Sequence, residues 1–220
     1  TIPFYLVESN LVCPIEEVSK KEEYAAYTIR KKINKIRANY LREYQRQKLK
    51  NKSEIEVKNK DLNFVDDLDT YLEKMDFTQK SSCSNYFKGG YQEARKKLDN
   101  FIQNCLSEYD EKRNIPHLNY QSDLSPYLHF GQISAQEAAL AALNSKADAE
   151  PFLEELIVRR ELAFNFVYYN QNYDGSLKEI LSDWAYESLM EHKTDEREYL
   201  YDYQDFREAK THDKYWNAAQ

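Results

Sequence analysis

The sequence predicts a mainly helical protein, and three observations carry this prediction. Gly and Pro, which interrupt helices, number only 4 and 5 in 220 residues. Charged residues make up 31% of the chain, and the helix-favouring Leu, Glu, Lys, Ala and Arg are abundant. Apolar side chains recur every three or four residues in several segments. The length suits one good-sized domain, or one domain and part of another.

The chain opens with an apolar run over residues 2–7, which predicts a buried strand followed by a loop at Pro14. A single strand is not stable alone, so we expect it to pair with strands outside this sequence. The chain starts without Met and stops inside an apparent helix at Gln220. We therefore expect a fragment that lacks both ends of its protein.

A helical pattern follows over residues 22–50, where the recurring apolar side chains are Tyr24, Tyr27, Ile29, Ile33, Ile36, Tyr40, Leu41 and Tyr44. Residues 48–61 are polar and charged, which predicts a linker or a mobile loop. A short helix is expected over residues 64–75. Two glycines at positions 89 and 90 then break the chain before a helix over residues 91–106.

Residues 114–134 are loop-like, and Asp123 or Ser125 is expected to cap a turn that opens at the following proline. Ser134 should cap the next helix, and Glu137, three residues on, should complete a capping box. After residue 174 we expect short helices that are acidic and rich in tyrosine.

The helix expected to begin at Pro151 is apolar on nearly all sides, yet its middle contains Glu155, Arg159, Arg160 and Glu161. Glu155 and Arg159 are four residues apart, so they share one face of an α-helix and can pair. A buried charged pair loses hydration unless a polar group meets it. Two interpretations stay open: a structural ion pair, or the wall of a cavity that holds a polar ligand.

The net charge of −7 is unevenly distributed along the chain. Residues 20–60 contain 14 Lys and Arg against 5 Asp and Glu, which leaves the rest strongly acidic. A basic segment on an acidic chain can follow a phosphate backbone. It can equally be a solvated helix face.

Several classes of protein and site are excluded by the sequence. No apolar run is long enough for a membrane span and no signal peptide opens the chain, so we expect an intracellular protein, cytoplasmic or nuclear rather than secreted. The three cysteines, Cys13, Cys83 and Cys105, lie far apart, which indicates a reducing compartment and no metal site. The four histidines lack ligand spacing, and no Gly-rich phosphate loop or HExxH motif is present.

Ser122 and Ser125 place two hydroxyls beside backbone N–H groups at a helix start, where a phosphate can bind. The alternative is that they only cap that helix. Tyr109 and Arg113 are four residues apart at the end of a helix that leads into this serine loop. Trp216 lies in the last helical segment, and a lone tryptophan of this kind is usually a core residue.

Several long blocks of the chain resemble the class II cyclobutane pyrimidine dimer photolyases, within the photolyase/cryptochrome family. They are "SDLSPYLHFGQISAQEAAL", "FLEELIVRRELAFNFVYYNQNYD" and "REYLYDYQDFREAKTHDKYWNAAQ", supported by "IPFYLVE", "EEYAAYTIRKKI" and "YDEKRNIP". The blocks follow the family's order, and only residues 45–90 match it poorly. The resemblance is therefore more specific than any single motif.

The resemblance implies part of a helical FAD-binding domain, preceded by a strand and linker from an α/β, Rossmann-like antenna domain. The implied regions are residues 1–20 for the remnant of the α/β domain, 21–90 for a charged connecting region and 91–220 for the FAD-binding domain. It implies a monomeric lyase that repairs cyclobutane pyrimidine dimers in DNA, in light, by electron transfer from reduced FAD. The alternative is a non-catalytic derivative that binds damaged DNA or a partner.

The resemblance also assigns roles to residues. The implied FAD-binding residues are Tyr109, Ser122, Leu124, Ser125 and Arg159. The residues implied to bind the dimer are Arg113, Asn114 and Glu155. Glu155 is further implied to act in catalysis by hydrogen bonding the dimer, and Trp216 to relay electrons to the flavin.

The chain departs from the family's usual sequence at several positions. "DAHNIVP" is replaced by "ESNLVCP", and a tryptophan shortly after it by Glu16. "SNLSP" is replaced by "SDLSP", so the carboxylate of Asp123 would repel a bound phosphate unless it points away. "ELADNF" is replaced by "ELAFNF", which puts Phe164 where an acidic residue is usual.

Overall fold

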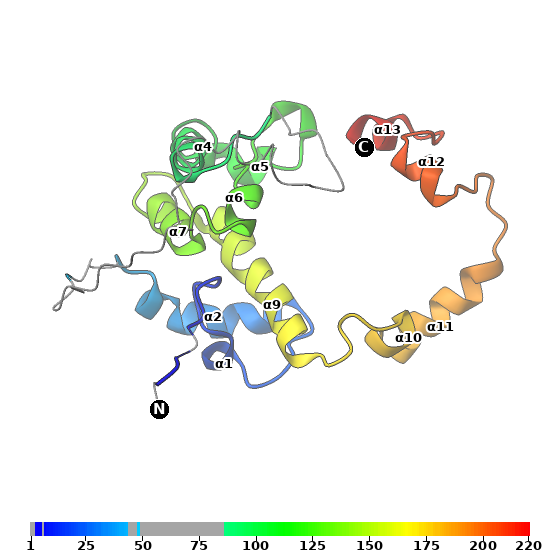
Figure 1. Ribbon diagram of the computed structural model, residues 1–220, viewed down its shortest axis with the longest axis horizontal. Helices are drawn as coiled ribbons and strands as arrows, with labels where there is room; N and C mark the ends of the chain where they lie inside the picture. The colour runs from blue at the N-terminus through cyan, green and yellow to red at the C-terminus, as the bar shows by residue number, and fades with distance from the viewer. Residues whose placement is uncertain (1–2, 6, 44–47, 49–85) are drawn as a thin grey trace, which may run out of the picture. The chain divides into compact units, whose positions relative to one another are not determined.

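The computed structural model describes residues 3–5, 7–43, 48 and 86–220 (Figure 1). Within these residues every regular element is a helix or a helical turn, which confirms the mainly helical prediction. The helix expected over residues 64–75 and nearly all of the expected linker lie outside the described residues, as does Cys83. The chain divides into two compact units, Thr1–Tyr169 and Asn170–Gln220. The expected regional boundaries at residues 20 and 90 stay a prediction.

The first unit is a set of packed helices. In chain order they are α1 (Ile15–Val18), α2 (Ala26–Tyr40), α4 (Tyr91–Asn104), the 3₁₀ turn η1 (Leu106–Glu108), α5 (Tyr109–Lys112), the 3₁₀ turn η2 (Pro116–Leu118), α6 (Ser125–His129), α7 (Ala135–Leu143), α8 (Glu150–Leu153), the π-helical turn η3 (Glu154–Arg159) and α9 (Arg160–Tyr169). The last three form one continuous helix that packs against α1, α2, α5 and α7 (Figure 1).

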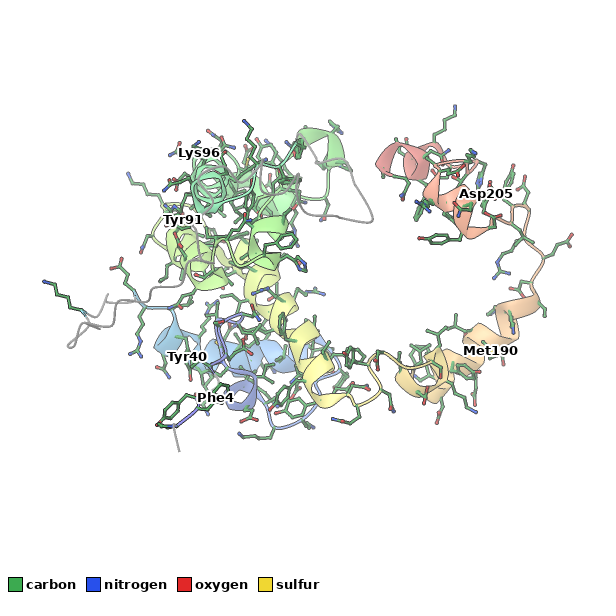
Figure 2. The ribbon with its side chains drawn as sticks, in the orientation of Figure 1. Phe4, Tyr40, Tyr91, Lys96, Met190 and Asp205 are labelled. Atoms are coloured by element: carbon green, nitrogen blue, oxygen red, sulfur yellow. The ribbon has the colours of Figure 1, made fainter. Side chains whose placement is uncertain are left out.

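The expected buried strand over residues 2–7 is wrong for the part of it that is described. Phe4, Tyr5 and Val7 are 88%, 81% and 76% exposed and form no regular element. Phe4 lies at the periphery of the first unit (Figure 2). A strand needs a neighbouring strand to take its backbone hydrogen bonds, and the described residues provide none.

Helix α2 is shorter than the expected 22–50 pattern. Ile29 and Ile33, four residues apart, are buried and carry the apolar stripe, whereas Tyr24 and Tyr27 stay exposed. The chain before α2 is held instead by polar contacts, because the backbone N–H of Glu23 donates to Asn165 Oδ1 at 2.7 Å. Helix α2 is thus held by its buried apolar face and by the hydrogen bond that fixes the chain just before its first turn.

Helix α4 agrees closely with the expected 91–106 helix. Gly90 precedes it with φ +111°, a conformation that favours glycine. Ala94, Leu98 and Phe101 recur at four and three residues and are buried. They join a core built from all the packed helices, so α4 is fixed by the stripe that predicted it.

The helix caps follow the predictions in part. The side chain of Ser134 accepts a hydrogen bond from the backbone N–H of Glu137 at 3.0 Å, which confirms the cap. The capping box is wrong, because the Glu137 carboxylate accepts from Tyr91 and Arg95 on α4 instead. Helix α6 begins at Ser125 without a side-chain cap, so neither Asp123 nor Ser125 has the expected capping role.

The second unit contains α10 (Leu177–Ile180), α11 (Asp183–Glu191), the 3₁₀ turn η4 (His192–Thr194), α12 (Tyr203–Arg207) and α13 (Lys214–Ala219). These elements confirm the short acidic helices expected after residue 174. No side chain in this unit is buried. Its contacts are mostly local ones between aromatic rings and at helix starts, such as the Asp202–Asp205 capping box on α12.

Candidate active site

The continuous helix from Glu150 to Tyr169 changes its winding in the middle. Pro151 sits in its first turn, and Leu153 and Ile157 are buried at the core face. Over Glu154–Arg159 the helix is π-helical, with hydrogen bonds between residues five apart rather than four. The wider turn changes which side chains lie above one another.

This change of winding overturns the expected Glu155–Arg159 pair. Arg159 Nε lies 3.5 Å from Glu154 Oε1, five residues before it, because positions five apart align in a π-helical turn. Glu155 is directed elsewhere, and its Oε1 accepts from Arg113 Nη1 at 2.6 Å. Glu154 therefore pairs with Arg159, whereas the adjacent Glu155 pairs with Arg113.

Glu154 is fixed from the other side by α2. Arg30 donates from Nε to Oε2 at 2.8 Å and from Nη2 to Oε1 at 2.7 Å, a two-pronged arrangement that fixes the carboxylate plane. These hydrogen bonds lower the pKa of Glu154, although burial opposes the shift. Glu154 thus presents a fixed negative charge to Arg159, whose side chain is 57% exposed.

A cavity of about 880 Å³ lies beside this turn, within the first unit. That volume is in the range of small-molecule sites. Most of the predicted site residues line it: Tyr109, Arg113, Asn114, Ser122, Ser125, Glu155 and Arg159. The cavity-wall interpretation of the charged helix is therefore the one that the structure supports.

Two predicted site residues do not line the cavity. Leu124 is 1% exposed and belongs to the core, and its backbone carbonyl accepts from the N–H of Leu128. Trp216 belongs to the second unit, where it is 46% exposed rather than a core residue. Its ring packs edge-to-face on Phe206, with 5.3 Å between centroids. Its role as an electron relay stays a prediction.

An aromatic cluster forms the apolar side of the cavity. Tyr109 lies edge-to-face against Phe101 and Phe152, with ring centroids 5.4 and 5.8 Å away. Burial raises the pKa of Tyr109, and a hydrogen bond from Arg113 partly opposes that shift. The phenol is therefore neutral near pH 7 and offers a rigid, flat surface.

The polar side of the cavity is rich in arginine. Arg113, Arg159 and Arg160 line it, whereas Glu155 is the one lining carboxylate among the described residues. The buried Nε of Arg113 has no hydrogen-bond partner among the residues that the structure describes, although the guanidinium lies 5.5 Å from the centre of the Tyr109 ring. A surplus of guanidinium groups and an unused donor suit an anionic ligand.

Sequence reasoning missed about half of the cavity lining as site residues, including Asn10, Gln121, His129, Phe152, Arg160 and Phe164. The local signals were few: Arg160 directly follows Arg159, and Phe164 stands where the resembling family usually has an acidic residue. Asn10 reaches the cavity from the far end of the chain, because Arg160 donates to its backbone carbonyl. That contact spans 150 residues of sequence and has no local pattern.

Glu161 holds the same N-terminal segment from inside the core. It is 2% exposed, and its Oε1 accepts from the backbone N–H groups of Val12 at 3.1 Å and Cys13 at 2.9 Å. Its Oε2 is buried and has no hydrogen-bond partner within the described part of the chain. Burial outweighs the two backbone hydrogen bonds and raises the pKa of Glu161 to about 7.

Most of the basic side chains of α2 form ion pairs within the first unit. Arg30 pairs with Glu154, Arg37 with Glu150, and Lys32 with the buried Glu23. Burial alone would raise the pKa of Glu23, but hydrogen bonds from Lys32 and Ser19 outweigh it and lower the value to about 2. Most of residues 44–60 lie outside the described part of the chain, so contact of this segment with DNA stays a prediction.

Within the described residues, His, Cys, Asp and Glu side chains form no group of three that could hold a metal ion. A membrane-crossing helix is also absent from the parts of the chain that the structure describes.

Comparison with known proteins gives a consistent result, although no protein-family model matches the chain. The whole chain aligns, at 38% identity over 226 residues, with the deoxyribodipyrimidine photo-lyase of Methanothermobacter thermautotrophicus. It is also 37% identical over 230 residues to the enzyme of that name from Arabidopsis thaliana, and 33% over 227 residues to that from Potorous tridactylus. The alignments cover 47%, 45% and 41% of these relatives, so the chain spans about half their length. Over its whole length, this chain is therefore similar to proteins named deoxyribodipyrimidine photo-lyase.

Proposed function

We propose that this chain is part of a class II photolyase that acts inside the cell and repairs cyclobutane pyrimidine dimers in DNA in the light. The observation that carries the proposal is the cavity beside the π-helical turn. It gathers Tyr109, Arg113, Ser122, Ser125, Glu155 and Arg159, which come from three separate parts of the chain. The relatives compared above, all named deoxyribodipyrimidine photo-lyase, add support.

The residues around the cavity fit FAD as a cofactor. The hydroxyls of Ser122 and Ser125 and the guanidinium of Arg159 would hold its phosphates, and the aromatic cluster at Tyr109 offers an apolar surface for its rings. The unused donor on Arg113 Nε is consistent with a polar ligand. When bound in its reduced form, FAD supplies the light-driven electron that splits the dimer.

Glu155 and Arg113 would bind the dimer. Photolyases are among the enzymes that take their target bases out of the DNA stack. Glu155 already accepts from Arg113 through Oε1, and its side chain is 38% exposed, so its remaining acceptor sites are available to a base edge. Arg113 holds the carboxylate in place and limits its freedom before the substrate arrives.

The non-catalytic alternative gains no support from the relatives, because each of them carries the name of the enzyme. The monomeric state stays a prediction.

The proposal is tested by preparing the complete protein with reduced FAD, adding DNA that contains cyclobutane dimers, and illuminating with blue light. Loss of dimers in the light, and none in the dark, is expected. Dimers that stay intact under illumination of a flavin-loaded, folded protein would contradict the proposed function. Tight dimer binding without turnover would instead revive the non-catalytic alternative.

A further inference from the structure

The loop that carries the two cavity serines also carries an acidic residue between them. Ser122 and Ser125 line the cavity, whereas Asp123 does not. Asp123 has φ +54°, in the left-handed region that Asp and Asn tolerate better than most residues. This backbone conformation turns the side chain of Asp123 to a different side from its neighbours.

The carboxylate of Asp123 is held by α4. Lys97 Nζ lies 3.1 Å from Asp123 Oδ2, and the Tyr86 hydroxyl donates to the same oxygen at 3.4 Å. The Lys97 ammonium also lies 4.9 and 5.1 Å from the centres of the Tyr86 and Phe87 rings. The Lys97 and Asp123 side chains are only 31% and 22% exposed, so the pair is partly shielded from water.

The position of Asp123 creates an electrostatic conflict in a phosphate site. A free carboxylate one residue from Ser122 and two from Ser125 would repel an anion bound by their hydroxyls. The ammonium of Lys97 both cancels that charge and holds the carboxylate on α4. Lys97 does not itself line the cavity.

We propose that Lys97 is a positioning residue for the cofactor site, because it neutralises Asp123 and thereby lets the Ser122–Ser125 loop accept the phosphates of FAD. This inference rests on the proposed function, since it assumes that the loop binds FAD. It assigns Lys97 on α4 a specific role, the neutralisation of the Asp123 carboxylate.

The test measures FAD affinity of the complete protein by fluorescence titration of the flavin-free form. Lys97→Met should weaken FAD binding roughly five- to tenfold, because one uncompensated charge then lies near the phosphates. Asp123→Asn added to Lys97→Met should restore the affinity, and Lys97→Arg should bind FAD as the unaltered protein does. Thermal unfolding verifies that each variant is folded.

Lys96→Met is the matched control, because it removes the same charge from the neighbouring position on α4 (Figure 2). Lys96 pairs with Glu93, and its side chain is 71% exposed. It should leave FAD affinity unchanged.

The outcomes separate the two proposals. Unaltered FAD affinity in Lys97→Met would overturn the inference alone, and so would a loss that Asp123→Asn does not restore, because Lys97 would then act only through packing. Failure of the unaltered protein to bind FAD would overturn the proposed function and the inference together.

Discussion

In the helix that runs from Glu150 to Tyr169, the π-helical turn pairs both of its carboxylates with arginines, whereas α9 places Glu161 against backbone N–H groups alone. The pKa of Glu154 is lowered, while that of Glu161 is raised to about 7. The difference follows first from burial, because Glu161 is 2% exposed whereas the side chain of Glu154 is 22% exposed, and then from the partners, because the Arg30 cation stabilises the charged carboxylate more than two neutral donors do. One helix therefore contains a turn of fixed charges beside the cavity and a buried anchor that can become neutral.

The largest expected effect concerns Glu161 and pH. Its pKa is about 7 in the folded protein against 4.5 for the ordinary group, so the folded state binds the extra proton between those values. Stability should be highest below about pH 4.5 as far as this group is concerned, and should fall as pH rises to 7. The loss is on the order of 3 kcal/mol. Chemical denaturation of the complete protein across this pH range measures it.

Glu161→Gln should remove this part of the pH dependence, since the amide oxygen can still accept from Val12 and Cys13 but does not titrate. Glu111→Gln, at an exposed position on α5, is the matched control and should keep the slope. An unchanged slope in Glu161→Gln would mean that Glu161 is not the titrating anchor.

The second effect concerns Glu154 in the π-helical turn and its partner Arg30. Arg30→Met removes the two-pronged partner of Glu154 and should destabilise the protein more than a substitution at a fully exposed neighbour does, because a partly buried carboxylate loses its main donor. Lys31→Met, at the exposed neighbouring position, should change stability by less than about 0.5 kcal/mol. Denaturant unfolding measures both variants. If Arg30→Met and Lys31→Met destabilise the protein equally, the pairing of Arg30 with Glu154 does not contribute more to stability than an exposed surface side chain does.

The third effect concerns chemistry rather than folding. Glu155→Gln should keep FAD but lower the yield of dimer repair per absorbed photon about tenfold, because a neutral amide hydrogen-bonds a charged transition state less strongly. Flavin absorbance gives the cofactor content, and loss of dimers under light gives the yield. A variant that repairs as well as the unaltered protein would make Glu155 a structural partner of Arg113 only.

The smallest effect is expected at Arg159. Its side chain is 57% exposed and 3.5 Å from Glu154, so Arg159→Met should change the free energy of unfolding by less than about 0.5 kcal/mol. If instead it destabilises the protein as much as Arg30→Met, Arg159 belongs to the structural network and not to the ligand-facing wall.

The sequence predicted those parts of the structure that depend on local patterns. The apolar stripe of α4 and the Ser134 cap were found because their partners lie within a few residues. The Glu155–Arg159 pair was wrong because it assumed α-helical winding, and nothing in the local pattern reveals a π-helical turn. The predicted strand was wrong for a different reason. A strand needs hydrogen bonds to other strands, and the described residues contain none.

The cavity was predicted in part from the chemistry of the charged helix and the two serines, and in part from the resemblance, which assigned roles to its residues. Tyr109, Ser122 and Glu155 were identified before the structure brought them to one wall. The supporting contacts were not, because Arg30 is 124 residues from Glu154 and Glu161 is 149 residues from Val12. Pairings over such distances are set by how helices pack, which no periodicity encodes.

The central claim is that the cavity beside the π-helical turn holds the flavin, and a visible absorption spectrum of the complete protein tests it most directly. The unaltered protein should purify with about one FAD per chain. Arg159→Met, which removes one charge from the cavity lining without removing a buried contact, should lose most of it while unfolding at the same temperature. A colourless, folded protein, or an Arg159→Met variant that keeps all its flavin, would contradict the account.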